Sequence, residues 1–158
     1  MKIIPYTVDD ALKVAEFFRE IFDEWGWDER PTDHMDEPHK LFYLPDGGLL
    51  LLVIENRNII GTAGVIKLSK VEGLIKRFYL KKQYRGTGTA QSLLQRLIKE
   101  AQKVGLKKLV LDVSRNNIRA THFYEKEKFL PTTVEPISDW PESNLPEEHF
   151  YFYKIIDK

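Results

Sequence analysis

The chain has 158 residues, of which 42% are hydrophobic and 12% aromatic, which indicates a folded domain with a sizeable core and excludes a disordered chain. Its 24 basic and 24 acidic residues balance, which argues against a general nucleic-acid-binding protein, and zero cysteines exclude disulfides, thiolate metal sites and cysteine nucleophiles. The longest aliphatic run, at residues 49–54, is far shorter than the roughly 20 residues of a membrane helix, and the first ten residues lack the apolar core of an export signal, so we expect a cytoplasmic protein without membrane attachment.

The charges are distributed unevenly along the chain. Residues 1–50 carry 5 bases and 12 acids, residues 51–108 carry 13 and 3, and residues 109–158 carry 6 and 9, which gives net charges of −7, +10 and −3. The positive middle segment favours an anionic ligand, and the negative segments on either side favour a cationic ligand next to it. Solvated charged faces would produce the same pattern and stay as the alternative.

The first half of the chain predicts a helix, an acidic loop and a hairpin. Apolar residues at helical spacing, after Thr7 and Asp10 in the arrangement of a capping box, predict a helix over residues 8–24. Residues 26–46 are rich in prolines and acids, with a short helix-like run, and predict a mobile wall outside the core. Two strands at residues 49–55 and 58–67 follow around an Asn-Arg-Asn turn.

The second half predicts alternating strands and helices. A strand at 72–80 leads through a glycine loop into a helix that starts near residue 92, and a strand at 108–113 leads into a helix over 118–126, so neighbouring strands should be parallel. Residues 131–148 contain four prolines and read as a long loop before a last strand at 150–156. Without a linker or repeat, residues 1–158 are expected to form a single domain.

Two glycines open the helix that follows the strand at 72–80. Free N–H groups and the positive end of the helix dipole favour a phosphate there, and Gly86 and Gly88 let its oxygens approach the backbone. A P-loop is excluded, because Thr89 and Ala90 follow the second glycine in place of Lys and Ser or Thr. A dinucleotide fingerprint is a weak alternative, because Gln91 stands where it needs a third glycine.

A third pattern fits the loop, and a second motif accompanies it. Gln83, Gly86 and Gly88 match the pattern Gln or Arg, two residues, Gly, one residue, Gly or Ala, with Arg85 directly before the first glycine. Behind the next strand stand Asn117, Ala120 three residues later, and Tyr124 four residues after that. Residues 74–129 thereby resemble the GCN5-related N-acetyltransferase (GNAT) superfamily, and the remaining elements match in order. The resemblance implies an α/β fold: a mixed, strongly twisted sheet whose central parallel strands splay apart to admit acetyl-CoA, flanked by helices.

The resemblance also implies an N-acetyltransferase and assigns the parts of acetyl-CoA to residues of this chain. The pyrophosphate would rest on the N–H groups of residues 85–90, with Lys81, Lys82 and Arg85 as counter-charges, while the pantetheine arm would pair with the strand before the loop and with the Asn117 amide. The expected cofactor-binding residues are Phe78, Tyr79, Leu80, Gln83, Arg85, Gly86, Thr87, Gly88, Thr89, Ala90, Asn117 and Tyr124.

Three residues are the expected catalytic groups. By resemblance, the Leu80 N–H would stabilise the oxyanion and Tyr124 would protonate the departing thiolate, although Tyr124 could simply be a core aromatic residue. The family often has a glutamate where this chain has Leu74, so Glu72 on the same strand face is the candidate general base, directly or through water. An exposed strand-edge acid is the alternative for Glu72, and Lys128, where the family often has glycine, leaves the form of that helix end open.

The segment after the first helix carries the expected acceptor residues, Trp25, Trp27, Asp28 and Glu29. Aromatic faces and carboxylates favour a cationic primary amine of a small molecule or peptide, whereas a solvated acidic loop with Trp25 anchored in the core is the alternative. No metal is expected, because the four histidines lack ligand spacing. The expected partners are acetyl-CoA and an amine, with no nucleic acid, and a homodimer is one expected assembly. The competing function is an acyl-CoA-binding sensor that has the same fold but catalyses no reaction.

Overall fold

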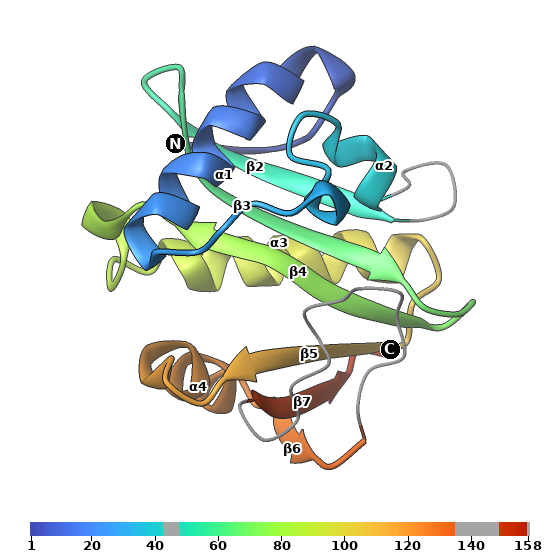
Figure 1. Cartoon of the computed structure of the whole chain (residues 1–158). Helices are drawn as coiled ribbons and strands as arrows, with labels where there is room; N and C mark the ends of the chain where they lie inside the picture. The colour runs from blue at the N-terminus through green and yellow to red at the C-terminus, as the bar shows by residue number, and fades with distance from the viewer. Residues whose placement is uncertain (43–47, 135–148, 158) are drawn as a thin grey trace.

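The computed structural model describes residues 1–42, 48–134 and 149–157. Seven strands form one mixed sheet in the order β1-β2-β3-β4-β5-β7-β6, with helices on both faces (Figure 1). The strands are β1 (Lys2–Pro5), β2 (Leu49–Glu55), β3 (Asn58–Lys67), β4 (Glu72–Leu80), β5 (Lys108–Ser114), β6 (Leu130–Thr132) and β7 (His149–Ile155). The helices are α1 (Ala11–Trp25), α2 (Pro38–Phe42), α3 (Thr89–Lys103) and α4 (Ile118–Lys126), with 3-10 turns η1 (Val8–Asp10), η2 (Pro31–Asp33) and η4 (Lys82–Tyr84).

The splay expected in the middle of the sheet is confirmed. β4 and β5 are the parallel pair, and their ladder joins only Glu72, Gly73 and Leu74 to Lys108, Leu109 and Val110. Beyond this short ladder the two strands diverge, as Figure 1 shows. The sheet is therefore open between the ends of β4 and β5 that lead into α3 and α4.

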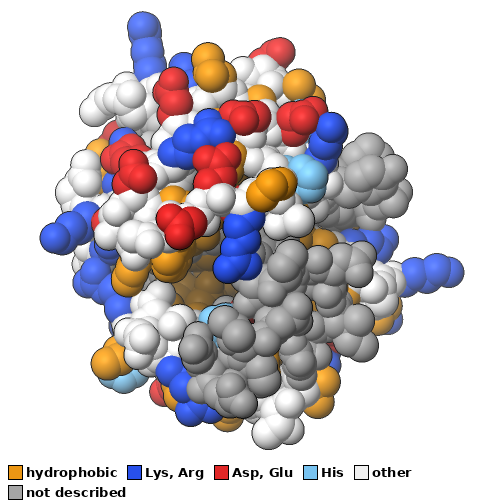
Figure 2. Space-filling view, in the orientation of Figure 1, with side chains coloured by type: hydrophobic (Ala, Val, Ile, Leu, Met, Phe, Trp, Pro, Cys, Tyr) orange, Lys and Arg blue, Asp and Glu red, His pale blue; other side chains and the backbone are white. Residues whose placement is uncertain are grey.

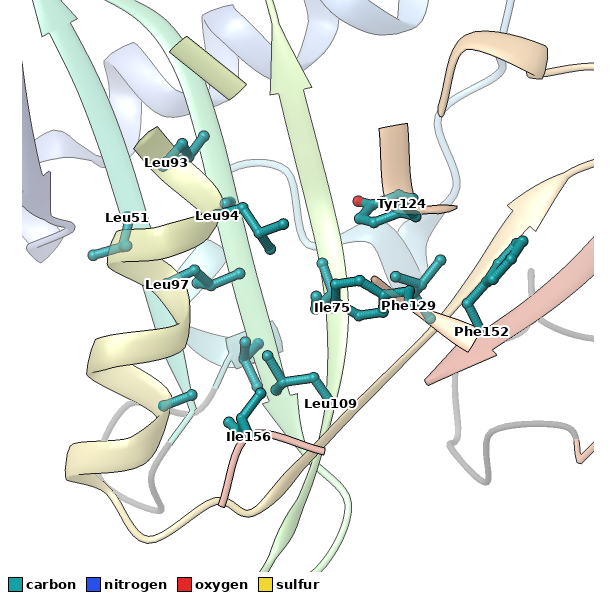
Figure 3. Packing of buried hydrophobic residues seen from close by; sticks show 14 of the residues in the cluster. Leu51, Ile75, Leu93, Leu94, Leu97, Leu109, Tyr124, Phe129, Phe152 and Ile156 are labelled. Atoms are coloured by element: carbon teal, nitrogen blue, oxygen red, sulfur yellow. The ribbon is translucent and has the colours of Figure 1, made fainter. Parts of the chain in front are cut away.

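Two apolar layers cover the faces of the sheet. Leu51 and Val53 of β2 belong to the core under α3, whereas Leu50 and Leu52 belong to the core under α1 and α2. Because both faces of β2 are covered, this strand is apolar at every one of these positions, as expected for a buried strand. Figure 3 shows the α3 side, where Leu93 and Leu97 face Ile75 and Leu109.

Local backbone geometry explains several element ends. Asn56 and Arg57 have positive φ angles of 49° and 65°, the conformation of a two-residue type I′ hairpin turn between β2 and β3. The predicted first helix begins as a 3-10 turn, with the Thr7 N–H donating to Asp10 Oδ2 at 2.9 Å, and ends at Gly26 with φ 69°. No helix in the described part of the chain is long and apolar enough to cross a membrane.

Two expectations about loops were wrong. The acidic segment after α1 is not simply a wall outside the core, because Asp33, Met35 and Phe42 are at most 2% exposed. The predicted loop from residue 131 contains part of a strand, since β6 pairs with β7 in antiparallel register. The rest of that predicted loop, residues 135–148, and the end of the helix-like run at 43–44 lie outside the described residues.

Candidate active site

The glycine loop presents a row of backbone N–H groups. Gly86 and Gly88 have φ angles of 74° and 87°, which favour glycine, and a Cβ atom at Gly88 would point into open space. α3 starts directly after Gly88, and its first helical hydrogen bond runs from Ser92 N–H to Gly88 C=O at 3.1 Å. Across residues 1–42, 48–134 and 149–157, no hydrogen bond engages the N–H groups of residues 86–91, so these donors face outward at the positive end of the helix.

The expected contribution of Arg85 and Lys81 to this loop needs correction. The Arg85 N–H donates to Lys82 C=O at 3.2 Å, so the outward-facing N–H groups begin at Gly86. The Arg85 guanidinium pairs with both oxygens of Glu24 at 2.6 and 2.8 Å and lowers the pKa of that carboxyl group, while Lys81 Nζ lies 3.2 Å from Glu20. Both cations are therefore engaged by acids of α1 and are not directed at an anion on the loop.

Arg119 is a cation near the loop that the sequence analysis missed. A Cβ atom placed on Gly86 would lie 3.6 Å from Arg119 Nη2, so this guanidinium sits beside the loop. Arg119 is exposed in the first turn of α4, which places it on the opposite side of the splay from β4. Lys82 is also exposed, so Arg119 and Lys82 are the cations available to an anionic ligand here.

The end of β4 exposes a backbone N–H to the splay. The Lys81 N–H donates to Ile60 C=O of β3 at 2.9 Å. Because successive N–H groups of a strand alternate between its two sides, the Leu80 N–H points away from β3 toward the diverging β5. The Leu80 C=O faces the same side and accepts a hydrogen bond from Arg85 Nε at 3.0 Å, which fixes the orientation of this residue.

A β-bulge at Arg77 sets which side chains face the site. Arg77 has a φ of 56° at a register shift between β3 and β4, and its C=O accepts a hydrogen bond from Thr62 Oγ1 at 2.7 Å. The extra residue turns Phe78 toward α4 and Tyr79 toward α1, where it contacts Phe18. The aromatic residues of β4 thus line opposite faces of the sheet at the splay.

Tyr124 of α4 packs across the splay from β4. Its ring is 5% exposed and lies edge-on to Phe78 and Phe129 at centroid distances of 6.0 and 5.3 Å. Figure 3 shows its hydroxyl directed toward β4. Burial raises the pKa of the Tyr124 hydroxyl well above its usual value, and Asp112 and Tyr79 raise it further, so the phenol keeps its proton at neutral pH.

Asn117 caps α4, as the sequence predicts. Its Oδ1 accepts a hydrogen bond from the Ala120 N–H at 3.1 Å, which satisfies one of the free donors at the helix start. The side-chain NH₂ group takes no part in this bond. An amide of a bound pantetheine arm is a ligand that this group could engage.

The structure does not bring Glu72 to this end of the splay. Glu72 lies in the closed part of the β4–β5 ladder, opposite Lys108, whose Nζ is 3.6 Å from Glu72 Oε2. With about 3.3 Å per strand residue, Glu72 and Leu80 are roughly 26 Å apart along β4. Leu74 is fully buried in the same closed part, so neither position can serve a reaction at Leu80 and Tyr124.

A charged cluster that the sequence analysis missed lies just beyond the last paired residues. Lys76 Nζ lies 3.0 Å from Asp112 Oδ1, and His149 Nδ1 lies 3.3 Å from Asp112 Oδ2, so β4, β5 and β7 each contribute one member. These side chains are only 12%, 7% and 17% exposed. Only the strand register brings them together, because residues 76, 112 and 149 are far apart in the sequence.

The expected acceptor residues form an aromatic surface at the end of α1. Trp25 and Trp27 stack with centroids 5.7 Å apart and are 44% and 43% exposed, so Trp25 is not anchored in the core. Asp28 is exposed, whereas Glu29 is engaged by Arg19 at 2.9 Å. Figure 2 shows acidic side chains gathered over this part of the molecule, above a recess lined by hydrophobic side chains.

A buried ion pair ties this acceptor segment to β4. Asp33 Oδ1 lies 3.1 Å from Arg77 Nη2, with side chains that are 1% and 2% exposed, and the Arg77 guanidinium lies over the rings of Phe18 and Phe22. The segment and the bulge are therefore fixed to each other. Among the described residues, no three His, Cys, Asp or Glu side chains are arranged to hold a metal ion.

Comparisons with known proteins identify the family. Residues 14–129, well over half of the chain, match the sequence pattern of the Acetyltransferase (GNAT) family. The chain belongs to the GNAT family. As a GNAT protein it is an acetyl-CoA-dependent N-acetyltransferase, and the glycine loop described above fits that co-substrate because its donors and open space suit a diphosphate.

Individual relatives agree with this assignment. The GNAT chain is 27% identical over 141 residues to streptothricin acetyltransferase A of Bacillus subtilis, covering 88% of this chain and 76% of the relative. A GNAT acetyltransferase structure from Staphylococcus aureus Mu50 is 25% identical, with a TM-score of 0.80 and 99% of both chains covered. The fold is also that of yncA from Salmonella typhimurium with its cofactor acetyl-CoA, at 18% identity, a TM-score of 0.75, and 99% and 94% coverage.

Proposed function

We propose that this GNAT protein transfers the acetyl group of acetyl-CoA directly to a cationic primary amine of a small molecule or peptide. The observation that carries the proposal is the Leu80 N–H, which points away from β3 into the splay, while the Tyr124 hydroxyl is directed toward β4. A hydrogen-bond donor for a developing oxyanion and a protonated acid for the leaving group thus face the same opening. Each of these groups lowers the barrier to acyl transfer from a thioester.

Acetyl-CoA would lie with its diphosphate on the N–H groups of residues 86–91. Arg119 and Lys82 are the exposed cations beside that position, and the arm would follow the open side of β4 past Phe78 to Leu80, with Asn117 contacting an amide. Gln83 and the backbone of Thr87 belong to the same surface. This path leads the thioester to the splay between β4 and β5.

The chain's own groups supply two contributions to the reaction. The Leu80 N–H would hold the thioester oxygen as it becomes negative, and removal of one such donor costs about a hundredfold to a thousandfold in rate. Tyr124 would give its proton to the departing sulfur, a contribution of about 10²- to 10⁴-fold for a well-placed acid. The packing of the Tyr124 ring against Phe78 and Phe129 supports this role, because it holds the hydroxyl at a defined position beside the splay.

The acceptor would enter over the aromatic surface of Trp25 and Trp27. Their exposed, stacked rings and the nearby Asp28 suit a cation. One relative is named for streptothricin, and one structure with the same fold is an aminoglycoside 6'-N-acetyltransferase complexed with coenzyme A, which supports a small-molecule acceptor.

The proposal is tested by following CoA release with a thiol reagent across a panel of amines. The chain has no cysteine, so the reagent detects only CoA. Amine-dependent release that is fastest with cationic primary amines is the expected result. Neutral or acidic acceptors that outperform every amine would contradict the proposed acceptor, and saturable acetyl-CoA binding without release would identify the protein as a sensor.

We further propose that the enzyme works in the cytoplasm, because its reaction consumes acetyl-CoA, and that it can assemble as a homodimer. Cell fractionation tests the location, and light scattering of the purified protein tests the assembly. A monomer at all concentrations would remove the dimer from the proposal without affecting the chemistry.

A further inference from the structure

The charged cluster of Lys76, Asp112 and His149 lies at the point where β4 and β5 diverge. Asp112 is 7% exposed and engages a different cationic or titratable side chain with each oxygen, at 3.0 and 3.3 Å. Lys76 and Asp112 together form a largely buried pair that bridges the diverging strands. This pair fixes the carboxylate in place, so His149 faces an acceptor atom of defined position.

The His149 ring turns its Nδ1 atom toward this carboxylate. Nδ1 is buried and lies 3.3 Å from Asp112 Oδ2, a contact that does not meet the criteria of a hydrogen bond. In the neutral tautomer that carries its proton on Nδ1, the other ring nitrogen, Nε2, is the proton acceptor. Because Nδ1 is buried, the 17% of the side chain that is exposed belongs to its other atoms.

The cluster lies next to the reacting groups. Asp112 contributes to the raised pKa of the Tyr124 hydroxyl, so its charge acts on that phenol. In the β5–β7 ladder His149 lies opposite Ser114, two residues further along β5 than Asp112 and thus further into the open part of the splay. His149 therefore lies at the level of the open end of the splay, on the strand that borders β5, whereas Glu72 lies in the closed part of the β4–β5 ladder.

We propose that His149 is the general base for the acceptor amine, with Asp112 and Lys76 as positioning residues; this inference rests on the proposed function. His149 Nε2 would take one proton from the acceptor ammonium and pass it to solvent. The neutral amine then forms the C–N bond, the C–S bond breaks, and the second nitrogen proton reaches the sulfur through Tyr124, which gives its own proton and regains one. The net products are the acetylated amine, CoA thiol and one proton.

The test compares acceptors that need a base with acceptors that do not. In His149→Asn the amide keeps a donor for Asp112 but removes the base. With an alkylamine, which is protonated at pH 7, we expect kcat/KM to fall by about a hundredfold or more. With a weakly basic amine such as methoxyamine, which is already neutral at pH 7, kcat/KM should stay within about threefold of the unsubstituted protein.

Two further measurements separate chemistry from structure. Calorimetry of acetyl-CoA binding should give the same affinity for His149→Asn as for the unsubstituted protein, and added imidazole should restore alkylamine turnover to His149→Ala. The matched control is His122→Gln, an exposed histidine of α4, which should leave both amines unaffected. Asp112→Asn should lower kcat with the alkylamine more than with methoxyamine, as expected for a residue that orients the base.

Equal losses with both amines, unchanged rates with both, or no rescue by imidazole would overturn the assignment of His149. Such results would leave the proposed function intact as long as the unsubstituted protein releases CoA with amines. The proposed function itself fails if the unsubstituted protein shows no amine-dependent release, or if neutral or acidic acceptors outperform every amine.

Discussion

At the scale of single residues, Tyr124 serves both packing and chemistry. Its ring lies among Phe78, Phe123 and Phe129, which fixes the position of the phenol, while its hydroxyl is directed toward β4. The two interpretations of Tyr124 that the sequence leaves open, core aromatic and acid, are therefore compatible. Rigid packing of this kind holds a catalytic proton at a defined atom.

Replacing Tyr124 by phenylalanine should remove the acid and keep the packing. We expect kcat to fall by about 10²- to 10⁴-fold while the affinity for acetyl-CoA stays within about twofold, because only the hydroxyl is lost. Steady-state kinetics and calorimetry measure the two quantities. Tyr153→Phe, which removes the hydroxyl of a half-buried tyrosine on β7, is the control and should change neither. An unchanged kcat in Tyr124→Phe would remove Tyr124 from the mechanism.

The Leu80 N–H can be tested by replacing the Leu80 amide with an ester, which deletes that donor alone. We expect kcat to fall by about a hundredfold or more with little loss of stability, because this N–H points to the splay and makes no ladder bond. The control is the corresponding ester at Lys81, whose N–H donates to Ile60, so it should lower stability by about 1 kcal/mol. Kinetics and thermal unfolding report both effects. Full activity of the Leu80 ester would disprove the oxyanion role.

At the scale of elements, the backbone is strained just after the end of α4, the helix that carries Tyr124. Lys128 adopts a left-handed φ of 68°, and the Phe129 N–H then donates to Tyr124 C=O at 2.9 Å. This chain has Lys128 where the family often has glycine, and the structure shows that the backbone there keeps a conformation that favours glycine. The lysine therefore carries a conformational cost that glycine would not.

Lys128→Gly should stabilise the protein, by about 0.5–1 kcal/mol in the free energy of unfolding, because glycine adopts positive φ without strain. Lys126→Gly is the control: at the last residue of α4, where the backbone is helical, the same substitution should destabilise by up to about 1 kcal/mol. Urea unfolding measures both values. A destabilised Lys128→Gly variant would show that the lysine side chain contributes more than its backbone costs.

The Asp33–Arg77 pair joins the acceptor segment to the bulge of β4. Asp33→Asn replaces the carboxylate that faces the buried Arg77 guanidinium by a neutral amide and should lower the free energy of unfolding by about 3–5 kcal/mol. Glu37→Gln removes the acid of an exposed pair with Lys40 and should cost less than about 1 kcal/mol. Chemical denaturation compares the two variants. Equal costs would show that the buried pair is not what fixes the segment.

At the scale of the whole molecule, the predictable features are those encoded locally. Glycine spacing, the Asn117 cap and the apolar run of β2 give the element order, and the family resemblance gives the splay that the short β4–β5 ladder confirms. The role of general base expected for Glu72 is not supported, because Glu72 lies at the start of β4, where β4 and β5 are still paired, and not at the open end of the splay. The cluster around Asp112 could not be predicted, since the register of three strands creates it.

The most direct test of the account is a titration of ¹⁵N-labelled protein with acetyl-CoA, followed by amide resonances. Binding through the glycine loop predicts the largest shifts at residues 86–91 and at Leu80, with inorganic pyrophosphate reproducing the loop shifts but not the one at Leu80. Saturable binding of acetyl-CoA that leaves the amides of residues 86–91 unmoved would contradict the account.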